Sequence, residues 1–160
     1  FALKDFRQLN ESIAQLGLLF KKKDQASVII EDLKKRIRPR SKNKGNALFI
    51  FSQVIRFSKI QEVFYLGRNT LHGEILKAAG YDNVAPIKNS YPKLSLEEVL
   101  KLAPQQIFVL LPTDLEKGEY INIQKAYSET SVLKNIKIKF IQYPPPYVNG
   151  PKIIGLINKL

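Results

Sequence analysis

Cysteine is absent from the 160-residue chain, and histidine occurs once, as His72. Without thiols, the sequence excludes disulfides, thiolate metal sites and cysteine nucleophiles within these residues. Because no second imidazole or thiol is available to join His72, we do not expect a dedicated metal site. We interpret His72, which lies in a helical pattern, as a surface or packing residue.

Long hydrophobic runs are also missing. No apolar stretch approaches the roughly 18 residues that a membrane-spanning helix requires. The sequence does not open with a signal peptide either, because residues 1–4 already belong to a helical pattern. We therefore expect the start to be a processed or truncated end.

Signatures of nucleotide binding and nucleophilic catalysis are scarce. Gly67-Arg68-Asn69-Thr70 leads into a helix, and free N–H groups at a helix start favour an anion, to which Arg68 would add charge. The segment lacks both the G-x-G-x-x-G fingerprint and the Walker lysine, and no serine occupies a recognisable nucleophile elbow. Two interpretations stay open: a phosphate-binding loop of an α/β enzyme, and a plain turn in which Asn69 or Thr70 caps the helix.

Positive charge is in clear excess, with 26 Lys and Arg against 14 Asp and Glu and a net charge of +12. Such a balance attracts nucleic acid, acidic lipid or an anionic ligand, and it is also typical of a well-solvated lysine-rich surface. No aromatic residues are interleaved with the basic segments 21–23 and 36–44. We therefore expect no nucleic-acid partner, and a basic adaptor for acidic surfaces stays open.

The apolar pattern predicts an α/β fold. Residues 3–20 carry apolar side chains every three or four positions, which predicts a long helix with Leu3, Phe6, Ile13 and Leu16 in the core. Short apolar runs at 47–51, 63–66 and 107–111 predict buried strands, and the alternating run at 136–140 predicts an edge strand. Helical patterns at 71–79, 95–103 and about 121–133 separate them. We expect three layers, with a mainly parallel central sheet and helices on both faces.

The stretch from residue 63 to residue 111 also resembles a known family. It contains the Gly67 loop, a helix ending in Ala78-Ala79-Gly80, and then Tyr91-Pro92-Lys93-Leu94-Ser95-Leu96-Glu97, followed by a helix ending in Pro104 and a buried strand. This order is similar to the C-terminal lobe of solute-binding proteins that serve ABC importers of iron-siderophores, haem and cobalamin (periplasmic binding proteins of class III). The resemblance implies a binding module without catalysis of its own. It also implies a metal chelate as ligand, a membrane subunit of the importer as partner, and a periplasmic or extracellular location.

The resemblance assigns roles to individual residues. Tyr91 matches an aromatic residue of the ligand cleft, and Tyr143-Pro144-Pro145-Pro146-Tyr147 matches the loop after the last strand, which also faces the ligand. We therefore expect Tyr91, Tyr147 and Pro144 to contact the ligand and to favour an apolar or planar one. Arg68, whose charge lies at the start of a helix, is the fourth residue that we expect to contact the ligand. Ser95 and Glu98 form a Ser-x-x-Glu capping box, which leaves Glu97 free to dock the transporter as its counterpart does.

The domain organisation follows from the same resemblance. Residues 1–22 would form the helix that joins two lobes, and residues 23–160 would form the C-terminal α/β lobe. The N-terminal lobe would then lie upstream of this chain.

Overall fold

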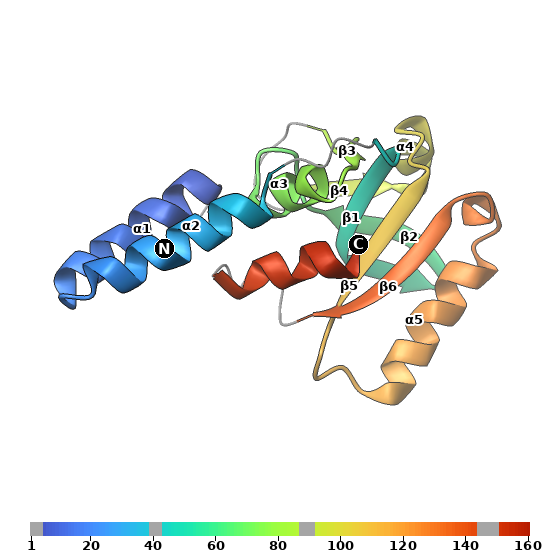
Figure 1. The fold of residues 1–160 in the computed structure, drawn as a ribbon. Coiled ribbons are helices and arrows are strands. Elements are labelled where there is room, and N and C mark those ends of the chain that lie inside the picture. The colour runs from blue at the N-terminus through green and yellow to red at the C-terminus, as the bar shows by residue number, and fades with distance from the viewer. Residues whose placement is uncertain (1–4, 39–42, 87–91, 144–150) are drawn as a thin grey trace.

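A computed structural model describes residues 5–38, 43–86, 92–143 and 151–160, and it contains one sheet with helices on both faces (Figure 1). The helices are α1 (Phe6–Leu19), α2 (Lys23–Arg36), α3 (Leu71–Ala78), α4 (Leu96–Lys101) and α5 (Lys117–Glu129), with the 3-10 helices η1 (Ser131–Leu133) and η2 (Pro151–Lys159). The strands are β1 (Asn46–Arg56), β2 (Lys59–Tyr65), β3 (Asp82–Asn83), β4 (Lys93–Ser95), β5 (Gln106–Pro112) and β6 (Lys137–Tyr143).

The sheet is mostly parallel, as the sequence predicts. Its strand order is β4-β2-β1-β5-β6, with β3 beside β1. Strands β3 and β5 run parallel to β1, and β6 runs parallel to β5. The predicted edge position of β6 is confirmed. Strand β2, which contains residues 63–65 of the predicted run 63–66, instead pairs antiparallel with β1, and β4 pairs antiparallel with β2.

No pattern in the sequence predicts the β1–β2 hairpin. Its turn consists of Phe57 and Ser58, which both have a positive φ, of 52° and 58°. Two left-handed residues in a row fit the twist of a two-residue hairpin, but Asn and Gly are the residues that usually occupy them. Because Phe-Ser is not a turn signal, the hairpin has to be imposed by pairing of the flanking strands.

Two hydrophobic cores lie on opposite faces of the sheet and account for its three layers. Along β5, Phe108 and Leu110 belong to one core, whereas Ile107 and Val109 belong to the other. The first core is closed by α1, α2, α3 and η2, and the second by α4, α5 and η1. The continuous apolar run of β5 is therefore buried on both faces, which is the reason for its composition.

The predicted core stripe of the first helix is correct only in its first half. Phe6, Leu9 and Ile13 are buried, but Leu16 is 53% exposed, so its predicted burial is wrong. Helices α1 and α2 form a hairpin that projects from the sheet (Figure 1). Near the end of α1, Gly17 is the residue that faces α2. A Cβ added to Gly17 would clash with the Cβ of Ala26. Leu3 lies outside the described residues.

Candidate functional site

The loop after β2 positions the start of α3. The hydroxyl of Thr70 accepts a hydrogen bond from the Gly73 N–H at 3.1 Å and donates one to the Gly67 carbonyl at 2.7 Å. A Cβ at position 73 would lie 2.7 Å from the Gly67 carbonyl oxygen and would clash with the Arg68 carbonyl. The loop is thus a tightly closed turn with Thr70 as the cap, which is the second of the two interpretations that the sequence left open.

Arg68 braces this loop. Its Nε donates a hydrogen bond to the Ala85 carbonyl at 2.7 Å, while the side chain is exposed to solvent. Ala85 follows β3, so this bond ties the Gly67 loop to the chain segment that leads toward β4. The predicted contact of Arg68 with a ligand stays a prediction, and the Nε hydrogen bond gives the side chain a structural role as well.

His72 is a packing residue and not a surface residue, which is one of the two interpretations made from the sequence. It is 4% exposed and lies edge-on to Phe49, with ring centroids 6.3 Å apart. Burial lowers the pKa of His72 to about 4, so the ring is neutral near pH 7. The buried Nε2 of His72 has no hydrogen-bond partner among the described residues. In the same part of the chain, no cluster of three or more His, Asp or Glu side chains could hold a metal ion.

Three of the predicted ligand contacts, Tyr91, Pro144 and Tyr147, lie outside the described residues. Their described neighbours lie on the two opposite edge strands. The Pro92 carbonyl accepts from the Tyr65 N–H at 3.2 Å just before β4, whereas Tyr143 ends β6. Strands β2, β1 and β5 lie between these edges. The ligand contacts expected of Tyr91, Pro144 and Tyr147 therefore stay predictions.

The structure adds an aromatic pair that the sequence pattern did not reveal. The rings of Phe51 and Phe64 are 6.2 Å apart and inclined by 55°, and both residues are partly exposed. Phe64 is paired with Lys93 across the β2–β4 ladder, next to Pro92. Both phenylalanines belong to runs that we interpreted as fully buried, and only the hairpin pairing brings them together. Two neighbouring, partly exposed rings form a surface suited to an apolar or planar ligand.

Glu97 lies in the first turn of α4 and is exposed. The predicted capping box is confirmed, since the Ser95 N–H donates to the Glu98 carboxylate at 2.8 Å and the Glu98 N–H donates to the Ser95 hydroxyl at 3.3 Å. Because Glu98 completes the cap, Glu97 is not required for it. No helix in the described part of the chain is long and apolar enough to cross a membrane.

Known proteins share both a sequence family and an architecture with this chain. Residues 1–142 match the family described as "Periplasmic binding protein", and no curated protein sequence matches the chain. An ABC transporter substrate-binding protein from Listeria monocytogenes EGD-e has a similar structure, with a TM-score of 0.74 and 16% identity over 98% of this chain and 64% of its own. IsdE of S. aureus, solved with heme, gives a TM-score of 0.69 and 18% identity over 98% of this chain and 64% of its own.

A third neighbour is described as an ABC-type Fe3+-hydroxamate transport system from Saccharomonospora viridis DSM 43017. Its TM-score is 0.65, at 18% identity over 98% of this chain and 55% of its own. The chain thus spans less than two thirds of the length of each of these three structures. Such identities show a shared fold, while the match over residues 1–142 shows the family. The chain belongs to the periplasmic binding protein family.

Proposed function

We propose that the chain is the C-terminal lobe of the substrate-binding component of an ABC importer, and that its ligand is a metal chelate such as an iron-siderophore, haem or cobalamin. The observation that carries this proposal is the family match over residues 1–142. Two structures of the same fold support the ligand class, since one is described with heme and another as part of Fe3+-hydroxamate transport. In this proposal the chain binds and delivers its ligand without catalysing a reaction, and it works on the periplasmic or extracellular face of the membrane.

The ligand surface in this proposal begins at the Phe51–Phe64 pair. The two rings offer apolar area and stacking to a macrocycle or a catecholate ring. Tyr91 directly precedes Pro92, and the next residue, Lys93, is paired with Phe64 across the ladder. In this proposal Tyr91 extends the surface from the β4 side, and Pro144 and Tyr147 extend it from the β6 side. The outer guanidinium of Arg68 would face carboxylates or phosphates of the chelate, and the net charge of +12 favours an anionic one.

A single lobe supplies half of a two-lobed cleft, so its own affinity for the chelate would be low. A second lobe would close the cleft, and the membrane subunit of the importer would engage the exposed Glu97. Glu97 suits this role because its carboxylate is accessible and Glu98 already completes the helix cap.

The test is a titration of the natural-length protein with hemin, ferric desferrioxamine and cyanocobalamin. We expect one of the three to bind with a saturable change in its absorbance spectrum. Phe64→Ala should weaken that binding by about tenfold, since it removes one of the two aromatic rings that would contact the chelate. Ile121→Ala, at an exposed position on α5, is the matched control and should leave binding unchanged. Failure of all three chelates to bind would refute the proposed ligand class.

A further inference from the structure

The tip of the β1–β2 hairpin carries the most exposed large apolar side chain in the described part of the chain. Phe57 is 95% exposed, and its neighbours Ile55, Arg56, Ser58 and Lys59 are exposed as well. The ring of Phe57 therefore adds nothing to the cores on either face of the sheet. A lone exposed apolar residue is normal on a soluble protein, so a role for this one has to rest on further features of the tip.

Two such features are unfavourable for the isolated protein. Phe57 has a φ of 52°, in the left-handed region, where a bulky side chain crowds the backbone and where asparagine or glycine usually stands. Arg56 and Lys59 are direct partners across the ladder, so two like charges face each other. Residues held in unfavourable conformations concentrate where proteins bind other molecules. The tip is therefore a candidate binding site.

The base of the tip is fixed by buried contacts. Ile60 directly follows Lys59 and is only 1% exposed, and its N–H donates to the Thr130 hydroxyl at 3.0 Å. The same hydroxyl donates to the Ala126 carbonyl of α5 at 2.7 Å. These bonds tie the hairpin to the end of α5. Phe57 is thus presented on a preformed support, and binding would not have to order the tip first.

Both charged side chains of the tip are cations. None of the ion pairs in the described part of the chain includes Arg56 or Lys59. The only carboxylate on β1 or β2 belongs to Glu62, which pairs with Lys93 at 2.8 Å. An exposed aromatic ring between two cations suits an anionic lipid surface, because the ring can enter the boundary between headgroups and acyl chains while the cations meet phosphates.

We infer that the β1–β2 tip is a membrane contact, in which Phe57 inserts into the interface of an anionic lipid bilayer and Arg56 and Lys59 bind lipid phosphates. The phosphates would screen the two facing cations from each other. Burial in the interface would give the ring at position 57 a purpose that an asparagine could not serve. One ring and two cations provide weak, reversible binding, so the tip orients the protein on the membrane and does not anchor it. The contact is additional to the proposed function, which supplies only the presence of a membrane nearby.

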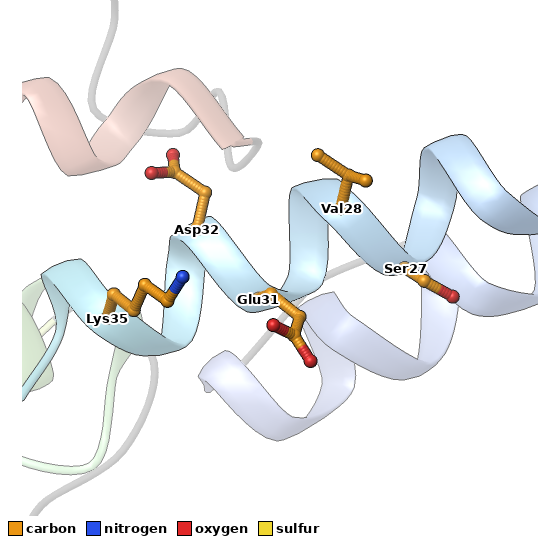
Figure 2. A pocket seen from close by; sticks show the side chains of 5 residues that line it. All are labelled: Ser27, Val28, Glu31, Asp32 and Lys35. Atoms are coloured by element: carbon orange, nitrogen blue, oxygen red, sulfur yellow. The ribbon is translucent and has the colours of Figure 1, made fainter.

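Another exposed apolar side chain has the opposite surroundings. Val28 lies on α2 beside a hollow of about 360 Å3, whose lining also includes Ser27, Glu31, Asp32 and Lys35 (Figure 2). Figure 2 shows Val28 and Asp32 pointing to the same side of the helix. Two carboxylates against one ammonium group give this lining a net negative charge, which anionic lipid repels. Exposure alone is therefore not the criterion, and the cations beside Phe57 distinguish the tip.

The fluorescence of a single tryptophan tests the insertion, because the chain contains no tryptophan of its own. Phe57→Trp places the reporter at the tip, and Ile121→Trp places it at an exposed position of α5 as the matched control. On vesicles of equal parts phosphatidylglycerol and phosphatidylcholine, we expect the emission of the Phe57→Trp protein to shift to the blue and to be quenched by lipids brominated on their acyl chains. The control protein should show neither change. Pure phosphatidylcholine vesicles at the same lipid concentration should also give neither change for the Phe57→Trp protein.

Co-sedimentation with the anionic vesicles measures the affinity of variants that lack the reporter. Phe57→Asn should weaken binding by about tenfold, since it removes the inserted ring, and its melting temperature should not fall, because asparagine tolerates the turn. Arg56→Gln and Lys59→Gln should each weaken binding by about fivefold. Lys117→Gln, which removes an exposed cation at the start of α5, is the matched control and should change binding little.

Two outcomes would overturn the inference. If Phe57→Asn binds normally and all three charge variants weaken binding equally, the net charge of +12 alone holds the protein on the vesicles. If the emission of the Phe57→Trp protein does not shift on anionic vesicles, the tip does not insert and a protein partner is the better explanation for its exposed ring. Because these vesicles contain no chelate, insertion by a protein that binds no chelate would refute only the proposed function.

Discussion

The protein should lose stability in mild acid because of its one histidine. His72 is buried against Phe49, and burial lowers the pKa of its imidazole from the ordinary value of 6.5 to about 4. In the unfolded chain the ring is in water and takes up a proton near pH 6.5. Between these two values the unfolded state binds more protons than the folded state, so stability falls as the pH falls. At about pH 7.5 and above the ring is neutral in both states, and His72 adds almost no pH dependence.

The size of this effect follows from the two pKa values. A pKa difference of about 2.5 corresponds to about 3 kcal/mol once the pH is well below both values, and about 2 kcal/mol of that is lost between about pH 7.5 and about pH 5. Carboxylates titrate in acid too, so the histidine has to be isolated by substitution. His72→Leu replaces the imidazole by an apolar side chain of similar size that does not titrate. The stability of this variant should therefore fall by about 2 kcal/mol less than that of the unaltered protein over the same pH range.

Urea unfolding at about pH 7.5 and about pH 5 measures the difference directly for both proteins. Proton NMR gives an independent reading, since the single histidine yields one imidazole signal, whose titration midpoint should lie near 4. Equal pH dependence of the two proteins within about 0.5 kcal/mol, or a midpoint near 6.5, would contradict the buried neutral histidine.

Three further predictions concern the hairpins and the docking residue. Leu9→Ala, at a position only 2% exposed, should cost ~2–5 kcal/mol in urea melts, whereas Leu16→Ala should cost less than about 0.5 kcal/mol; equal losses would contradict the exposure of the α1 end. Phe57→Asn should stabilise the protein by about 1 kcal/mol, because asparagine tolerates the positive φ of the turn; a lower melting temperature would show that the ring itself is stabilising. Glu97→Ala in the natural-length protein should leave chelate affinity intact and reduce uptake, whereas Glu119→Ala, on α5, should change neither; normal uptake by the Glu97 variant would remove the docking role.

Local signals in the sequence were sufficient for several elements. Ser95 and Glu98 predict the start of α4 because a capping box depends only on residues three positions apart. The run 107–111 predicts a strand buried on both faces, because five successive apolar residues leave no polar side chain for a solvent-exposed face of a strand or helix. Strand β5 is buried on both faces, as predicted. The resemblance carried by the Gly67 loop and the segment from Tyr91 to Glu97 identified the family, which the match over residues 1–142 shows.

Tertiary structure alone decided the hairpins. The pairing of β1 with β2 depends on contacts between strands, and the Phe57-Ser58 turn gives no local signal, so neither the hairpin nor the Phe51–Phe64 surface could be predicted from periodicity. The same limit explains Leu16. A helical stripe shows which side of α1 is apolar, but the length over which the stripe is buried depends on where α2 and the sheet end. The sequence thus determined the main helices and the buried runs, because their signals are local, whereas contacts between distant segments determined the pairing of the strands and which apolar side chains stay exposed.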